Sequence, residues 1–182
     1  TLLVSATFPP SVQSVAARYQ RDPVMVSGSA PGTSNSDIAY STMIVPPNQT
    51  VPALVNVLLM DPTAKTLIFV RTREDSTRLA DALAELGFAA RPLSGDLNQR
   101  ERTATLNAFR RDQTPILVAT DVAARGLDIS DLEAVINVDV TPDPEVYIHR
   151  IGRTGRADRD GWALSLASPN QMRRVDAIAR ET

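Results

Sequence analysis

From Ile38 onward, short runs of β-branched and apolar residues alternate with longer stretches that have helical spacing. Short apolar runs of this kind are typical of strands, and apolar residues three and four positions apart are typical of helices packed on a core. The pattern predicts strands at 41–45, 66–70, 89–93, 116–120, 134–138 and 162–166, and helices at 51–60, 73–86, 99–111, 144–151 and 169–180. Strands that alternate with helices are joined by right-handed crossovers. We therefore expect an α/β fold, a parallel β-sheet with helices on both faces.

The first residues of the chain have a different organisation. Residues 1–27 contain an apolar run at 2–5, a helical pattern after Pro9-Pro10 and a second apolar run at 24–26, which predict strand, helix and strand. Residues 28–37 are rich in Ser, Gly, Pro and Asn, a composition typical of a flexible linker, and 38–182 form the main domain. Strands in 1–27 would lack a sheet of their own, so we expect this segment to be either mobile or docked elsewhere, with dimerisation as one route.

Polar residues follow three of the expected strands directly. Thr72, Ser94-Gly95-Asp96 and Thr120-Asp121 stand at these junctions. The carboxyl ends of parallel strands share one edge of a sheet, and ligands collect there. A purely structural interpretation also exists, because Thr72 and Thr120 are good helix N-caps and Gly-Asp is an ordinary turn pair. Both interpretations can hold together, since helix N-termini also bind phosphate.

Residues 147–156, Tyr-Ile-His-Arg-Ile-Gly-Arg-Thr-Gly-Arg, place three arginines around two glycines after the start of an expected helix. Gly152 and Gly155 open the backbone, so the arginines that follow them can approach a polyanion closely. The alternative is a solvated basic loop. Charge and spacing alone leave both interpretations open.

Three stretches in order, Ser5-Ala6-Thr7, residues 118–129 (Val-Ala-Thr-Asp-Val-Ala-Ala-Arg-Gly-Leu-Asp-Ile) and residues 147–156, resemble motifs III, V and VI of the DEAD-box ATP-dependent RNA helicases. Residues 67–72 are similar to motif IV of that family, and Gln99-Arg100-Glu101-Arg102 is similar to motif IVa. The resemblance implies a RecA-like sheet. It also implies that the chain is the C-terminal lobe of such a helicase, preceded by the end of the N-terminal lobe.

The resemblance also implies roles for particular side chains. Contacts to the sugar-phosphate backbone of single-stranded RNA are implied for Thr72, Arg102 and Thr120. Asp128 would hold the ribose of ATP, and Arg153 and Arg156 would be arginine fingers that reach its γ-phosphate. Coupling between the lobes is implied for Ser5, Thr7, His149 and Arg150.

Two features of the family are missing from the sequence. It contains neither Gly-x-x-x-x-Gly-Lys-[Ser/Thr], the loop that cradles phosphates, nor the Asp-Glu-Ala-Asp run that holds Mg²⁺ in the family. The resemblance therefore implies that ATP with Mg²⁺ is the cofactor, with the metal held by the N-terminal lobe. That lobe and RNA are the expected partners, and the isolated chain is expected to be inactive.

The composition of the chain limits the kinds of ligand and metal site that it is expected to have. The net charge of −2 and the pI of about 5.4 argue against a generally basic nucleic-acid binder, although clustered arginines can set the local potential. The chain has no cysteine and one histidine, so a thiolate or zinc site is not expected. With no apolar run long enough to span a membrane, we expect a cytoplasmic protein without a membrane partner. Aromatic residues are few, at 4%, which favours RNA backbone contacts with weak sequence preference.

Two other functions stay open at this point. One is a lobe of a DNA-translocating superfamily-two motor, against which Ala-Ala-Arg-Gly-Leu-Asp-Ile and His149-Arg150 argue. The other is a non-catalytic RNA chaperone or scaffold module, which a lobe with an intact phosphate loop in the same polypeptide would exclude.

Overall fold

The computed structural model of the 182-residue chain describes residues 2–4, 10–26, 37–62, 64–125, 129, 132–155 and 159–181. The chain divides into two compact units, Thr1–Thr33 and Ser34–Thr182. The smaller unit contains helix α1 (Pro10–Tyr19). The larger unit contains every strand that the structure describes.

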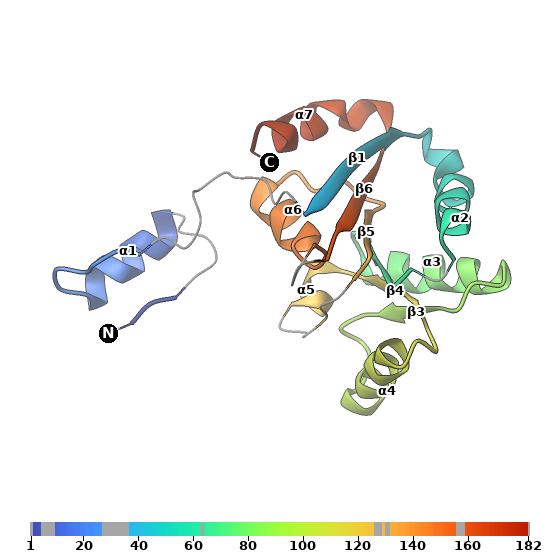
Figure 1. The fold of residues 1–182 in the computed structure, drawn as a ribbon, viewed down its shortest axis with the longest axis horizontal. Coiled ribbons are helices and arrows are strands. Elements are labelled where there is room, and N and C mark those ends of the chain that lie inside the picture. The colour runs from blue at the N-terminus through green and yellow to red at the C-terminus, as the bar shows by residue number, and fades with distance from the viewer. Residues whose placement is uncertain are drawn as a thin grey trace. The chain divides into compact units, whose positions relative to one another are not determined.

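A six-stranded parallel sheet forms the centre of the larger unit, with the strand order β1-β6-β5-β2-β4-β3 (Figure 1). The strands are β1 (Ile38–Ile44), β2 (Thr66–Phe69), β3 (Ala90–Leu93), β4 (Ile116–Ala119), β5 (Ala134–Asn137) and β6 (Gly161–Ala167). The predicted α/β architecture is therefore confirmed.

Helices cover both faces of this sheet, and the alternating side chains of β2 show how they divide. Ile68 packs with residues of α2 (Thr50–Met60) and α3 (Arg73–Glu85). Leu67 and Phe69 point to the other face and pack with residues of α4 (Gln99–Arg110) and α5 (Asp121–Ala124). On the same face as α4, α6 (Pro144–Ile151) and α7 (Met172–Glu181) cover β1 and β6. Because side chains alternate along a strand, one apolar strand supplies both cores.

Two element boundaries differ from the sequence prediction for local reasons. Strand β1 begins at Ile38 rather than residue 41, because Gly161 N–H donates to Asp37 O at 2.8 Å and extends the ladder with β6. The last helix begins at Met172 rather than residue 169. Residues Pro169–Gln171 form a 3₁₀ turn, η2, and Ser168 N–H donates to the Gln171 side chain at 2.9 Å. A second 3₁₀ turn, η1 (Pro47–Gln49), precedes α2.

The predicted strands in the smaller unit are wrong where the structure describes them. Residues 2–4 and 24–26 are not in strands, and their apolar side chains are largely exposed. A strand needs a neighbouring strand for its backbone hydrogen bonds, and no such partner is present among the described residues of this unit. The helical prediction after Pro9-Pro10 is confirmed by α1.

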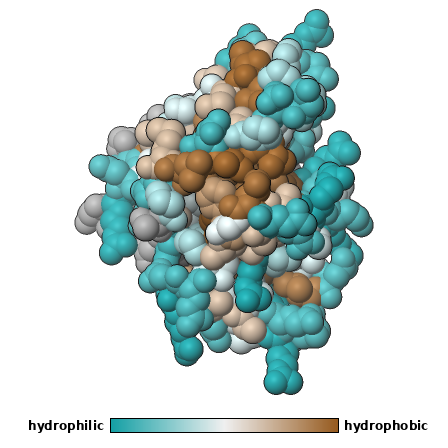
Figure 2. Space-filling model, turned by 90° about the vertical axis from the view of Figure 1, so that its right-hand side faces the viewer, coloured by the Kyte–Doolittle hydropathy of each residue, from teal (hydrophilic) through white to brown (hydrophobic). Residues whose placement is uncertain are grey.

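Helix α2 has no charged residue, and its outer side exposes Leu59 and Met60. Figure 2 shows apolar side chains gathered on the face of the molecule that carries this helix. Charged residues normally cover the outer side of a surface helix, so this face is unusually apolar. Among the described residues, the structure has no helix with the length and apolar character needed to cross a membrane.

Candidate nucleic-acid and nucleotide site

Two threonines cap helices at the carboxyl-terminal edge of the sheet. Thr72 Oγ1 accepts a hydrogen bond from Asp75 N–H at 3.1 Å and donates to Asp75 Oδ2 at 2.7 Å, at the start of α3. Thr120 Oγ1 accepts from Ala123 N–H at 3.4 Å, at the start of α5. The preceding strands β2 and β4 are neighbours, so both helix N-termini lie at the same edge. The predicted N-caps are confirmed, and the two threonines expected to contact RNA share this edge.

Arg102 reaches the same region from α4. The helix begins with a capping box, in which Asn98 and Glu101 exchange side-chain to backbone bonds at 2.9 and 3.0 Å. Arg102, half-buried, donates from Nη2 to Ala123 O at 2.7 Å and so attaches α4 to α5. A guanidinium carries five N–H donors, so this bond leaves others for a phosphate. No local pattern predicts the contact with Ala123, because it joins residues 21 positions apart.

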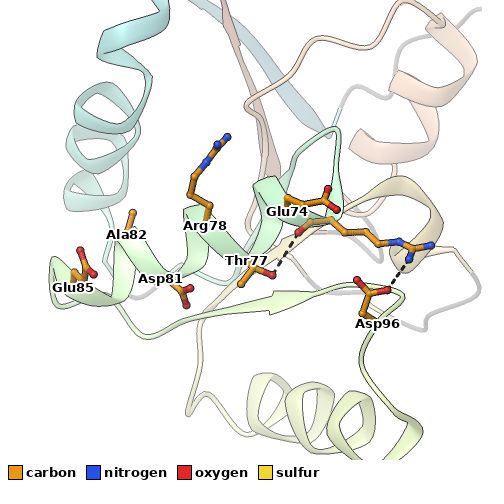
Figure 3. Close-up of a pocket in the computed structure, with 8 residues that line it drawn as sticks. Glu74, Thr77, Arg78, Asp81, Ala82, Glu85 and Asp96 are labelled. Carbon is orange, nitrogen blue, oxygen red and sulfur yellow. Dashed lines mark hydrogen bonds and ion pairs between the residues drawn. The ribbon is translucent and has the colours of Figure 1, made fainter.

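The third predicted junction, the turn after β3, is tied to α3 by an ion pair between Arg73 and Asp96 at 2.6 Å (Figure 3). Both side chains are more than half exposed, so the pair contributes at most about 1 kcal/mol. Beside it, a groove of about 670 Å³ runs along the outer side of α3. Its lining residues carry charges of both signs: Arg73, Glu74, Thr77, Arg78, Asp81, Ala82, Glu85 and Asp96. This groove includes none of the predicted site residues.

Arg150, in the last turn of α6, is buried and makes four hydrogen bonds. Its Nε and Nη2 donate to the two carboxylate oxygens of Asp121, at 2.7 and 2.8 Å. Its Nη1 donates to Asn137 Oδ1 at 3.1 Å and to Asp139 O at 2.9 Å. The guanidinium also lies 5.0 Å from the centre of the Phe69 ring. One side chain therefore joins α6 to α5, β5 and β2.

This network was not visible in the sequence, since Asp121 and Arg150 are 29 positions apart. Asn137 is itself fully buried, and its Nδ2 has no partner among the described residues. Nearby on α6, burial raises the pKa of the Tyr147 phenol, while its hydrogen bond with Ser165 lowers that pKa. Arg150 thus contacts groups of its own lobe, and its coupling to another lobe stays a prediction. His149, its neighbour, is exposed.

Arg153 lies in the turn that follows α6 and is half-buried. Its N–H donates to Arg150 O at 3.2 Å, so the buried Arg150 fixes the start of the turn. The next residue, Thr154, is buried. A half-exposed guanidinium on a turn that is bonded to α6 can stabilise a phosphate through charge-assisted hydrogen bonds.

Four predicted site residues, Ser5, Thr7, Asp128 and Arg156, lie outside the described residues, and their roles stay predictions. Among the described residues, no three His, Asp or Glu side chains come together as a group that could hold a metal ion.

Comparison with known proteins supplies a family context for this arrangement. Residues 49–158 match the helicase conserved C-terminal domain. The chain is 39% identical to the Escherichia coli ATP-dependent RNA helicase DbpA over 189 residues, which covers 98% of the chain and 39% of DbpA. The chain thus spans about two-fifths of the length of this relative.

Solved structures of DEAD-box proteins are also similar to this chain. A DEAD-box protein from Methanococcus jannaschii superposes with a TM-score of 0.76 at 35% identity, covering 97% of this chain and 47% of that one. Dbp5 from Saccharomyces cerevisiae, bound to RNA and ADP BeF3, superposes with a TM-score of 0.85 at 29% identity, with the same coverage. The RecA-like sheet expected from the sequence is therefore confirmed.

Proposed function

The chain belongs to the DEAD-box RNA helicases through their conserved C-terminal domain, and we propose that it is the C-terminal lobe of an ATP-dependent enzyme that separates RNA strands locally. The observation that supports this most directly is the ion pair between the buried Arg150 and the partly exposed Asp121. It joins α5, which Thr120 caps at the expected RNA edge, to α6, which leads into the Arg153 turn. A lobe that grips RNA and nucleotide together needs such a rigid connection.

In this proposal the RNA contacts are made by Thr72, Arg102 and Thr120. The 13-residue helix α3 begins at this edge, and backbone N–H groups at a helix N-terminus can donate to phosphate oxygens. Contacts of this kind position a strand without reading its bases, so sequence preference will be weak. The RNA-bound Dbp5 structure, similar in fold, supports the assignment of this lobe to RNA.

The nucleotide would be ATP with Mg²⁺, whose metal neutralises phosphate charge when bound and would be held by the N-terminal lobe. Asp128 would hold the ribose, and Arg153 and Arg156 would stabilise the charge that develops on the transferred phosphoryl group. These arginines reach the nucleotide only when the two lobes close. RNA and ATP, each bridging the lobes, would therefore favour the same closed state and strengthen one another's binding.

Coupling of hydrolysis to strand separation would use Ser5 and Thr7 from the first segment, together with His149 and Arg150. We assign residues 1–27 to the end of the N-terminal lobe and 28–37 to an interlobe linker. The exposed apolar side chains of residues 2–4 and 24–26 would then be covered by that lobe, or by a second copy in a dimer. The proposal places the protein in the cytoplasm.

The isolated 182-residue chain is expected to show no RNA-stimulated ATP hydrolysis, because it contains no phosphate-binding loop. The same residues within a polypeptide that also carries the N-terminal lobe are expected to hydrolyse ATP when single-stranded RNA is added. Phosphate release by the two purified proteins, with and without RNA, tests this expectation.

The matched control is the two-lobe protein with the lysine of its phosphate-binding loop changed to alanine, which reveals any contaminating ATPase. Turnover by the isolated chain above that background would contradict the two-lobe proposal. Stimulation by DNA but not by RNA would favour the DNA-translocating motor instead.

Arg102→Ala in the two-lobe protein is expected to weaken binding of single-stranded RNA to a similar degree for unrelated sequences. Loss of one phosphate contact should also reduce the slope of log affinity against log salt concentration by about 0.7. Fluorescence-anisotropy titrations at several salt concentrations, with two unrelated RNAs, measure both effects.

Arg100→Ala is the matched control, since it removes the same charge from an exposed position of the same helix. A thermal unfolding curve shows whether loss of the Arg102 bond to Ala123 O disturbs the fold. Equal slopes for Arg102→Ala, Arg100→Ala and the unchanged protein would mean that Arg102 only attaches α4 to α5. A loss confined to one RNA sequence would indicate base reading instead.

A further inference from the structure

The hydroxyl of Thr154, the residue after Arg153, contacts the two residues that precede β5. The residue is 1% exposed. Its Oγ1 donates to Leu132 O and lies 3.3 Å from Glu133 O, and Leu132 and Thr154 also form an isolated parallel bridge. These contacts join segments more than 20 positions apart in the sequence. The Arg153 turn, residues 152–155, therefore has an anchor at its downstream side.

The upstream side of the same turn is anchored by main-chain bonds to α6. Arg153 N–H donates to Arg150 O at 3.2 Å, and Thr154 N–H donates to Ile151 O at 3.0 Å. Arg150 is itself fixed by Asp121, Asn137 and Asp139. Arg153 thus stands between two buried residues whose side chains are each tied to other elements.

Two glycines close the space around Thr154. A Cβ on Gly161 would lie 1.9 Å from Thr154 Oγ1 and 2.6 Å from Gly155 N. Gly155 has a φ of +61°, and a Cβ there would lie 2.3 Å from Ile38 Cγ1. Neither position has room for a side chain, so the starts of β6 and β1 pack directly against the turn. The turn has little freedom to move while the Thr154 hydroxyl keeps its bond.

We propose that Thr154 is a positioning residue for ATP hydrolysis, which fixes the main chain of the Arg153 turn so that the Arg153 guanidinium is aimed before nucleotide arrives. This inference rests on the proposed function, because it concerns the rate of the reaction assigned there. Leu132 follows Asp128, the expected ribose ligand, by four positions. The Thr154 bond therefore connects the two stretches of this lobe that would face the nucleotide.

The expected effect follows from how precisely a transition-state contact must be placed. Functional groups must stay within about 0.5 Å of the productive geometry, and a displacement of about 1 Å can reduce a rate about 100-fold. Thr154→Val keeps the shape of the side chain but removes the donor from Leu132 O and Glu133 O. We expect it to lower kcat about 10- to 100-fold in the two-lobe protein. The KM for ATP and the affinity for RNA should change less than about threefold, because the valine touches neither ligand.

Thr154→Ser restores the hydroxyl without the methyl group and is expected to keep kcat within about threefold of the unchanged protein. The matched control is Thr66→Val. Thr66 is also 1% exposed, and its hydroxyl also donates to a main-chain carbonyl, that of Ala64 at 3.1 Å, in a turn before β2. The control removes the same chemistry outside the Arg153 turn, so it should leave kcat nearly unchanged after correction for the folded fraction.

A second measurement uses the 182-residue chain and needs no activity. Hydrogen exchange of the backbone amides of residues 152–155 should become faster in Thr154→Val and stay unchanged in Thr66→Val. The proposal is overturned by unchanged exchange at these amides, by equal kcat losses in the two valine variants, or by a large kcat loss in Thr154→Ser. If Thr154→Val does not fold, the serine variant decides alone. A two-lobe protein without RNA-dependent ATPase would refute the proposed function, while the exchange result would still test whether Thr154 holds the turn.

Discussion

Arg153→Ala in the two-lobe protein will lower the rate of ATP hydrolysis by about 10³-fold or more, the effect expected for removing an arginine finger in phosphoryl transfer. The guanidinium would stabilise charge that is greatest in the transition state, so kcat should fall while RNA affinity without nucleotide stays nearly the same. Arg153 is half-buried in the turn after α6, and its removal leaves the Arg150 network in place. The protein should therefore remain folded.

Arg153→Lys should recover little of this rate, because an ammonium group cannot make the planar, two-pronged contact of a guanidinium. Steady-state kinetics with saturating RNA, together with RNA binding in the absence of nucleotide, separate the two effects. Arg173→Ala, which removes an exposed arginine from α7, is the control for loss of charge. Near-normal turnover of the Arg153→Ala protein would show that Arg153 is only a surface charge.

The sequence predicted those features whose signals are local. The apolar runs of β2, β4 and β5 are buried on both faces of the sheet, so they appear as continuous short runs that periodicity detects. The cap at Thr72 depends on residues three positions apart, and it was predicted correctly. The order of the strands in a parallel sheet then brought Thr72 and Thr120 to one edge.

Features that depend on distant partners could not be predicted. The bonds of Arg150 to Asp121 and of Thr154 to Leu132 span 29 and 22 positions, and no local pattern marks them. Arg150 is one example, because its contacts with Asp121, Asn137 and Asp139 O are made by residues 11 or more positions away. The strand predictions at 2–5 and 24–26 were wrong for a related reason. An apolar run becomes a strand only where another strand is present to pair with it.

Asp121→Ala is expected to destabilise the α/β unit by about 3–5 kcal/mol, because it leaves the guanidinium of Arg150 buried without its carboxylate partner. The Arg150 side chain is 4% exposed, and that of Asp121 is 31% exposed. Loss of its partner therefore leaves Arg150 in a less solvated position than Asp121. After Arg150→Met, water can reach the remaining carboxylate of Asp121. The unbranched apolar side chain of methionine fills much of the space that the arginine occupied. We expect a smaller loss, of about 1–3 kcal/mol, which arises largely from Asn137 and Asp139 O losing a donor.

Urea unfolding followed by the fluorescence of Trp162 measures these losses, since this single tryptophan lies on β6. Arg78→Ala is the matched control, because it breaks an ion pair with Asp75 in which Arg78 is 79% exposed, and it should change the unfolding free energy by less than about 1 kcal/mol. Added salt should weaken the exposed pair more than the buried one. If Asp121→Ala unfolds at the same urea concentration as Arg78→Ala, the buried pair contributes no more than a surface contact. The expected result is strong destabilisation by Asp121→Ala and weaker destabilisation by Arg150→Met. It would show that the energy of this connection between α5 and α6 depends on desolvation of the guanidinium rather than on the number of hydrogen bonds lost.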